Sequence, residues 1–434
     1  MKTVSFSLGA CALLAILHGL AGMTGLALMW ISVPLLLLVK QVWVRVALPI
    51  LLVLGGLFWI VTVVPGWQSS IAPGVPTLGL IGVLSGVASS SLGAALAFQN
   101  RRQQSEAITT TVWAGASALA FFLTFALLAM VQWKMVQPVG VLLERFIPAG
   151  GWLQAFWLST YAAWLTEKLR LPGLWRVWRP RVWRLFSAVF FLQLILGLAG
   201  LKQFLMTGKL HLPVPALIVA GPLYRGGGLF MLILFSASLL LVGPAWCSWL
   251  CYIGSWDDLA ARQRKLPRPL PQWRRHVRWA ILVLIIAVAY LLGRLGISGV
   301  AAAWLAGAFG LAGVGLMVIW SRRTGMMTHC TTYCPIGWLA TRLGKLSPFR
   351  IKINDACTDC GVCTTVCRFD ALGPEDIQRR QPGEACTLCG DCIGRCKARD
   401  IEYRFLGLST EKARTVFLVL VVSLHAVFLG VARL

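Results

Sequence analysis

Cysteine carries most of the chemistry that this sequence could perform. Eight of the thirteen cysteines lie in one repeat, in which ACTDCGVCTTVC (356–367) returns 29 positions later as ACTLCGDCIGRC (385–396). Both halves have the spacing C-x2-C-x2-C-x3-C, in which three close thiolates bind one cubane and the fourth reaches across to the other cluster. We therefore expect two 4Fe–4S clusters here. The first would be held by Cys357, Cys360, Cys363 and Cys396, and the second by Cys386, Cys389, Cys392 and Cys367.

Two details of the repeat bear on its occupant. Gly361 and Gly390 each follow a second cysteine, where the backbone must turn tightly without a Cβ. Zinc is the rival occupant because four thiolates also suit it, but zinc sites rarely use three cysteines at successive x2 spacings. Ferredoxins typically have proline after the fourth cysteine. Here that position is occupied by Arg368 in one half and Lys397 in the other. These cations either offset the negative charge of a cluster or are ordinary solvated side chains.

Four further cysteines form two pairs just past the ends of apolar runs. Cys247 and Cys251 lie in GPAWCSWLCYIGS (243–255), and Cys330 and Cys334 lie in MMTHCTTYCPIGW (326–338). Residues four apart share one side of a helix, so two helix ends can present four thiolates to a common centre. Such a centre would hold an iron–sulfur cluster, zinc or copper(I). A redox-active dithiol and simple apolar filling stay open as alternatives. His329, beside Cys330, either binds the metal, lowers a thiol pKa, or does neither.

The elements that must position these cysteines are membrane helices. Of 434 residues, 58% are hydrophobic and only 13% are charged, against about 25% charged in soluble domains. Runs long enough to cross a bilayer recur along the chain. We expect eleven spans, with Cys11 a buried thiol in the first of them. The runs fall near 4–20, 22–39, 43–65, 76–98, 108–132, 146–165, 183–201, 226–245, 275–295, 297–320 and 413–432.

The net charge of +25 comes mainly from Lys and Arg in every second connection between these runs. The positive-inside rule then places the N-terminus, both cysteine pairs and the segment 345–405 in the cytoplasm. Because the cytoplasm is reducing, its cysteines argue for metal ligation rather than disulfides. No concentrated basic domain is present, which disfavours nucleic-acid binding.

The expected fold class is an α-helical polytopic membrane protein of about eleven helices with a small cytoplasmic α+β ferredoxin domain for two clusters. The expected parts are an N-terminal membrane domain (1–137), a weak span with a basic connection (138–182), a membrane core with both cysteine pairs (183–344), the ferredoxin domain (345–405) and a final helix (413–434).

Other redox or transport chemistry finds little support. Charged residues are almost absent from the apolar runs, which disfavours an ion pump. No C-x-x-C-H site for covalent haem occurs. His18 and His425 lie in apolar runs, and we expect them to be hydrogen-bonded packing residues rather than haem ligands.

At the cysteine motifs the sequence resembles the NapH- and NosR-type membrane polyferredoxins, which combine C-x3-C-P pairs at helix ends with two C-terminal four-cysteine motifs. Cys330-Thr-Thr-Tyr-Cys334-Pro335 matches fully, whereas Cys251 is followed by Tyr252. The resemblance covers roughly 183–405. The four-span form of that family leaves residues 1–182 and the last span unexplained. The related CcoG/RdxA group, linked to copper handling, shares the motifs but ends in a β-domain.

The resemblance implies electron transfer between the quinone pool and a redox partner, such as a membrane or periplasmic reductase complex, in a bacterial cytoplasmic membrane. We predict an electron-transfer subunit rather than a stand-alone enzyme. It would have two 4Fe–4S clusters, a third iron–sulfur or metal centre at the C-x3-C pairs, and a quinone. A copper-handling maturation factor and an iron–sulfur redox sensor are the alternatives.

Overall fold

The computed structural model of the chain contains two compact units, Met1–Glu167 and Lys168–Leu434. It describes residues 10–12, 14–16, 18–19, 22–38, 41, 43–58, 108–134, 140–205 and 212–431. All twelve cysteines of the motifs lie in the second unit. The expected span at 76–98 lies outside the described residues.

The first unit is helical. Its described elements are α2 (Thr24–Ser32), η1 (Val33–Leu38), α3 (Val44–Phe58), α6 (Ile108–Lys134), η4 (Leu142–Arg145) and α7 (Gly150–Leu169). A core of Trp30, Trp43, Phe121 and Phe156 joins these helices. Cys11 is buried in the same core, as expected of an apolar thiol.

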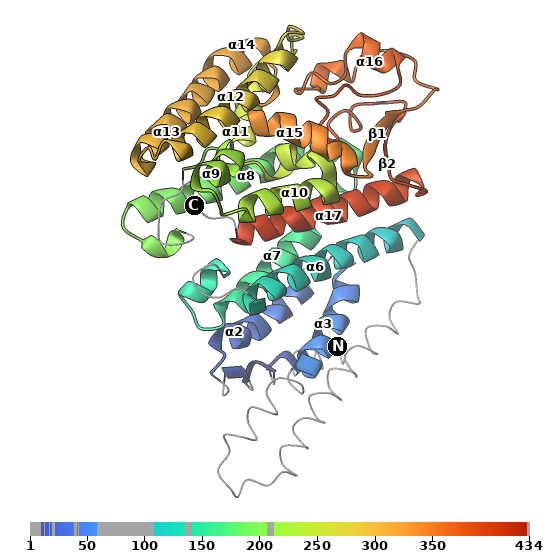
Figure 1. The fold of residues 1–434 in the computed structure, drawn as a ribbon. Helices are drawn as coiled ribbons and strands as arrows, with labels where there is room; N and C mark the ends of the chain where they lie inside the picture. The colour runs from blue at the N-terminus through green and yellow to red at the C-terminus, as the bar shows by residue number, and fades with distance from the viewer. Residues whose placement is uncertain are drawn as a thin grey trace, which may run out of the picture. The chain divides into compact units, whose positions relative to one another are not determined.

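The second unit is built on helices, several of which have one end beside residues 345–405, called the ferredoxin segment below (Figure 1). The longer helices are α8 (Pro172–Leu198), α9 (Leu217–Arg225), α10 (Phe230–Val242), α11 (Gly254–Ala261), α12 (Arg274–Arg294), α13 (Gly299–Leu316), α15 (Pro335–Leu343) and α17 (Thr410–Val431). Short helical turns complete them: η5 (Lys202–Phe204), η6 (Gly243–Ala245), η7 (Trp246–Leu250), η8 (Met317–Ser321), α14 (Arg322–Thr324), η9 (His329–Tyr333) and η10 (Gly344–Leu346).

Six helices among the described residues are long and apolar enough to cross a membrane. They are Trp113–Trp133, Pro172–Leu198, Phe230–Leu250, His276–Arg294, Gly299–Thr324 and Thr410–Val431. Two shorter apolar helices, Thr24–Leu36 and Val46–Gly55, match expected spans without reaching this length. The chain is therefore a mostly helical protein of membrane type, and eleven spans remain a prediction.

Helix α8 begins earlier than the sequence suggested. The prediction treated residues up to 182 as a basic connection, but the helix starts at Pro172, a residue that fits the first turn of a helix. Trp175, Arg179 and Trp183 follow one another at four-residue intervals, so they share one face of α8, and all three are buried. The basic stretch is thus a structural element that faces the ferredoxin segment.

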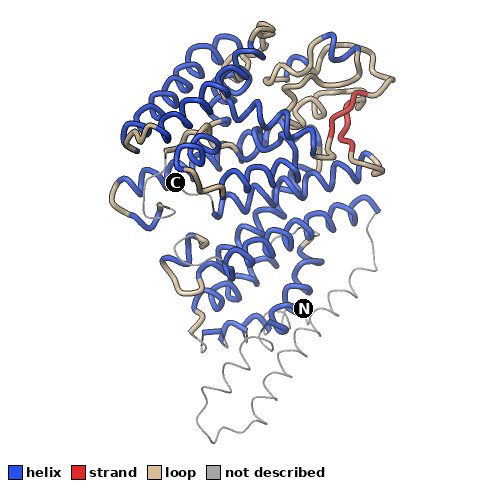
Figure 2. The backbone as a smooth tube through the Cα atoms, viewed as in Figure 1, coloured by secondary structure: helices blue, strands red, loops and turns tan. Residues whose placement is uncertain are grey.

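The ferredoxin segment consists mainly of loops (Figure 2), with η11 (Thr364–Val366), α16 (Pro374–Gln378) and two short strands. Strands β1 (Arg350–Ile353) and β2 (Ile401–Arg404) pair antiparallel. Helix α17 packs against β2, where the Tyr403 and Phe417 rings stack with centroids 4.4 Å apart. The last apolar helix, which the resemblance left unexplained, therefore supports the strand pair.

Candidate iron–sulfur sites

The repeated sequence folds into a repeated backbone. Left-handed residues recur at the same three places in both halves, namely Asp359 and Leu388, Gly361 and Gly390, and Asp370 and Arg399. The two glycines have φ of 69° and 80°, as the tight turn predicted. The four non-glycine residues are uncommon in this region. The common geometry shows that each half forms the same loop around its cysteines.

The structure gathers the cysteines of the second predicted set. Burial raises the pKa of the Cys392 thiol well above its usual value, and the neighbouring thiols of Cys389, Cys386 and Cys367 raise it further. Cys367 therefore lies near the cysteines of the other half. It is also a neighbour of Cys363, as are Cys357 and Cys360 of the first set, so the division of the eight cysteines between two clusters stays a prediction. Cys396 is half-buried.

The C-x3-C pairs lie on two turns of the same unusual shape. We expected each pair on an α-helical face, but η7 and η9 are π-helical turns that contain Cys247 and Cys330. The chain then becomes extended at the second cysteine of each pair, with φ/ψ of −81°/112° at Cys251 and −72°/116° at Cys334. Short π-helical turns are frequent at functional sites.

The two turns converge on one centre. Burial raises the pKa of the Cys330 thiol well above its usual value, and Asp257 and the thiols of Cys334, Cys251 and Cys247 raise it further. Yet among the described residues no three His, Cys, Asp or Glu side chains converge closely enough to hold a single metal ion. The centre has four thiols, those of Cys247, Cys251 and Cys334 buried and that of Cys330 partly exposed, and such a set suits an iron–sulfur cluster, zinc or copper(I). We name this set the membrane-edge site.

The Ile-Gly that follows each pair forms part of this site. The backbone N–H groups of Ile253 and Gly254 donate to the Cys251 thiol, and those of Ile336 and Gly337 donate to the Cys334 thiol. Hydrogen bonds of this kind stabilise thiolate ligands and tune a cluster.

Glycine is needed in this turn because its Cα lies against the backbone carbonyl of the first cysteine of the same pair. A Cβ at Gly254 would lie 2.9 Å from the Cys247 carbonyl oxygen, and one at Gly337 would lie 2.7 Å from that of Cys330. The shared Ile-Gly is therefore required by the geometry of the two turns.

Replacing Gly337 with alanine is expected to empty the membrane-edge site. The added Cβ must displace the Cys330 carbonyl, a backbone group that cannot move without its cysteine. If the site holds a 4Fe–4S cluster, iron per purified chain should fall by about four. Gly315→Ala is the matched control, since nothing lies within 4 Å of its Cβ position. If Gly337→Ala keeps all its iron, the Ile-Gly turn does not hold the ligands in place.

Two buried charges flank the membrane-edge site. Asp257 accepts a hydrogen bond from the Cys330 backbone N–H at 2.9 Å, and burial raises the pKa of its carboxyl to about 6. Arg278 lies on another side, where its charge favours the thiolate of Cys334. A thiolate cluster is negative, so Arg278 is placed to compensate part of that charge.

Four other residues that the sequence singled out are buried: His329, Arg368, His18 and His425. Burial lowers the pKa of His329 to about 4, so its neutral ring does not favour a thiolate at Cys330. Arg368 is not solvated, because its guanidinium donates to the carbonyls of Gly325 (2.8 Å) and Lys265 (3.1 Å). His18 and His425 are buried, and their Nδ1 atoms lie within hydrogen-bond distance of the carbonyls of Leu14 and Trp249 respectively.

Comparisons with known proteins agree with this chemistry. A family model described as a 4Fe-4S binding domain matches residues 225–269, which include Cys247 and Cys251. A protein of Escherichia coli (strain K12), provisionally named electron transport protein YccM, is 29% identical over 199 residues, or 40% of this chain and 52% of that protein. The chain thus spans about half the length of this curated relative. No solved structure matches. With the six apolar helices, these matches indicate a membrane-type protein with a 4Fe–4S binding domain.

Proposed function

We propose that the chain carries electrons through three 4Fe–4S clusters between a redox partner at the cytoplasmic face and a quinone in the bilayer. One observation carries this proposal. Cys330 of the membrane-edge site and Cys367 and Cys389 of the second ferredoxin set pack against the same apolar cluster of Trp183, Ala261, Met327 and Phe369. Predicted ligands of two candidate clusters therefore contact the same buried apolar side chains.

Trp183 connects this apolar cluster to the first cysteine pair. It is 1% exposed, and its Nε1–H donates to the Cys251 carbonyl at 2.8 Å. It thus touches the backbone of one pair while it packs in the cluster that covers Cys330, Cys367 and Cys389. Water is excluded from this contact, which favours electron transfer between fixed centres over exchange with solvent.

The exposure of the cysteines suggests the order of the relay. Cys360 of the first ferredoxin set is exposed, whereas each set has one buried cysteine, Cys363 or Cys392, and the other five are partly exposed. The first cluster would then exchange electrons with the redox partner, the second would lie in the middle, and the membrane-edge cluster would face the bilayer. In this role the cofactors supply the electron chemistry and the chain sets distance and potential.

The test is the iron and acid-labile sulfide content of anaerobically purified protein. Three cubanes require about twelve irons per chain, and two require about eight. We expect about twelve in the wild type and about eight in a variant with Cys247, Cys251, Cys330 and Cys334 changed to serine. If both proteins hold about eight, the membrane-edge thiols bind something else, and copper(I) binding is measured next.

A further inference from the structure

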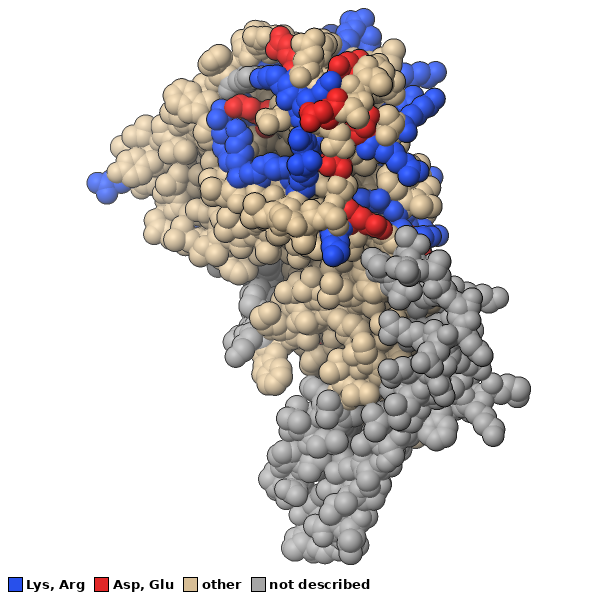
Figure 3. Space-filling view, turned by 90° about the vertical axis from the view of Figure 1, so that its right-hand side faces the viewer, with Lys and Arg blue, Asp and Glu red and all other residues tan. Residues whose placement is uncertain are grey.

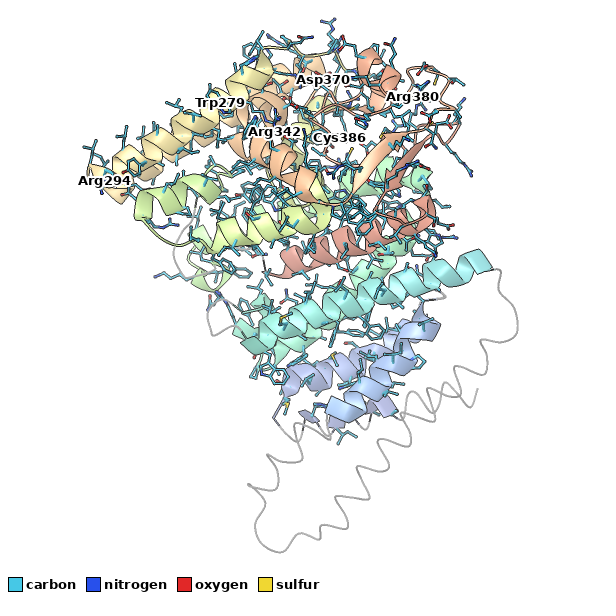
Figure 4. All side chains as sticks on the ribbon, turned by 45° about the vertical axis from the view of Figure 1, so that its right-hand side comes forward. Trp279, Arg294, Arg342, Asp370, Arg380 and Cys386 are labelled. Carbon is cyan, nitrogen blue, oxygen red and sulfur yellow. The ribbon has the colours of Figure 1, made fainter. Side chains whose placement is uncertain are left out.

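A pocket of about 460 Å³ opens beside the membrane-edge site. Its walls come from α12, α15 and the ferredoxin segment, and Figure 4 shows Trp279, Arg342 and Asp370 on these three parts. Lining side chains that matter below are Arg274, Arg278, Trp279, Trp338, Arg342 and Glu384.

The pocket shares a wall with the membrane-edge site. Arg278 lines the pocket, is 7% exposed, and faces the thiols of Cys334, Cys247 and Cys330. Its Nη2 lies 3.5 Å from Thr341 Oγ1, and its Nε has no hydrogen-bond partner among the described residues. A ligand in the pocket would therefore meet a buried donor whose other side faces the cluster ligands.

The charge of the pocket favours a neutral ligand. Arg274 pairs with Asp370 at 2.7 Å, and Arg342 pairs with Glu384 at 3.1 Å, so neither arginine is left with surplus charge. Arg278 faces thiolates. With Arg274 and Arg342 paired, a free anion would find little unpaired positive charge here besides Arg278. A cluster bound at the thiols behind Arg278, as proposed above, would be negative and would repel an anion. Figure 3 shows that Lys and Arg outnumber Asp and Glu on the charged part of the face it presents, so the pairing inside the pocket has to be taken from the individual contacts.

The pocket also has the aromatic lining and the position of a site for a lipophilic ring. Trp279 is 53% exposed, and the Arg342 guanidinium carbon lies 5.6 Å from the centre of the Trp338 ring. The apolar span of α12 begins at His276, so the pocket lies at the end of a membrane helix. Tryptophan is typical of that level of the bilayer. Only 17% of this span is buried inside the protein, which leaves most of it for lipid.

We infer that this pocket holds the ring of a membrane quinone, with Arg278 as a hydrogen-bond donor and Trp279 and Trp338 as its walls. The inference rests on the proposed function and names where that function meets the bilayer. When electrons pass from the reduced clusters to the quinone, two clusters each lose one electron, solvent supplies two protons, and one quinone becomes one quinol. Oxidation of a quinol at the same site runs through the reverse balance.

The test uses the full chain in lipid nanodiscs, reduced with dithionite under anaerobic conditions and freed of excess reductant. A short-chain ubiquinone is added, and cluster reoxidation is followed by stopped-flow absorbance. Trp338→Leu and Trp279→Leu should each slow reoxidation by about tenfold, because the ring loses an aromatic wall. Iron content and reoxidation by ferricyanide should stay as in wild type.

Trp273→Leu is the matched control, since Trp273 caps the same helix, is 59% exposed and does not line the pocket. It should behave as wild type. If quinone reoxidises all three variants at the wild-type rate, the pocket inference fails while the proposed function stands. If ferricyanide but not quinone reoxidises the wild type, the quinone part of the function fails as well.

A second measurement reports binding without turnover. A photoreactive azido-quinone should label peptides that contain Trp279 or Trp338, and excess short-chain ubiquinone should prevent the labelling. Labelling confined to other spans would overturn the inference. Displacement of the label by inorganic phosphate, but not by quinone, would also overturn it and would identify an anion site.

Discussion

Replacing Arg179 with methionine is expected to release the ferredoxin segment from the membrane helices. Arg179 lies on α8 at 1% exposure and binds Asp391 with two hydrogen bonds, of 3.0 Å from Nε and 2.8 Å from Nη2. Its Nη2 also lies 3.6 Å from Asp258, and its Nη1 donates to the Ser248 carbonyl at 3.1 Å. One side chain thus joins α8, α11, the first cysteine pair and the second ferredoxin loop.

The effect is large because the partners are buried. Burial alone would raise the pKa of the Asp391 carboxyl, but the charges and hydrogen bonds of Arg179 and Arg262 hold it at about 2. Without Arg179, two buried carboxylates share only Arg262, which lies 2.8 Å from Asp391 and 2.6 Å from Asp258. Removing one partner of a buried ion pair costs about 3–5 kcal/mol.

The measurement is urea unfolding of the ferredoxin segment in nanodiscs, followed by loss of cluster absorbance. Arg179→Met should lower the free energy of unfolding by about 3 kcal/mol. Arg379→Met is the control, because that arginine is 67% exposed and pairs with Asp376 at 2.7 Å on the surface. Exposed pairs contribute about 0–1 kcal/mol. Equal loss in the two variants would show that Arg179 does not anchor the segment.

Arg179 also shows where the sequence stops being informative. The eight cysteines of the repeat could be proposed as cluster ligands from spacing alone because the C-x2-C-x2-C-x3-C pattern is local in the chain. Asp391 is 212 positions from Arg179, and no local pattern links the two. A local signal did exist, since Trp175, Arg179 and Trp183 recur at four-residue intervals and so mark one helix face. The basic residues around them obscured it by favouring a solvated connection.

The membrane-edge site, too, could be predicted from the sequence only in part. Two identical C-x3-C spacings followed by Ile-Gly predicted a common centre, and the structure brings the four thiols together. The reason for the Ile-Gly could not be derived, because a π-helical turn has no spacing signature that separates it from an α-helix. Asp257 and Arg278 were not found either, since a buried charge beside a ligand looks like any other charge in sequence.

The second large effect is expected when Cys386, Cys389 and Cys392 are changed to serine together. On the proposed function, the variant should lose about four irons and keep the membrane-edge cluster and the first cluster, whose predicted ligand Cys360 is exposed. If the second cluster lies between these two, a reduced ferredoxin-type protein supplied in solution should still reduce the first cluster. The membrane-edge cluster should stay oxidised, because Trp183, Met327 and Phe369 would then border a site with no metal. Freeze-quench electron paramagnetic resonance distinguishes the clusters.

Trp183→Phe provides the conservative partner of this experiment. It keeps an aromatic ring in the apolar cluster but removes the Nε1–H that donates to the Cys251 carbonyl. All three clusters should remain, and the membrane-edge cluster should still be reduced, with an altered resonance signal because its ligand turn has lost an anchor. A membrane-edge cluster that is reduced at the wild-type rate in the triple-serine variant would show that electrons bypass the second cluster. In that case the apolar cluster that contacts Cys330, Cys367 and Cys389 only holds the ferredoxin segment against the membrane-edge site. Electrons would then pass from the first cluster, whose Cys360 is exposed, to the membrane-edge cluster without the second.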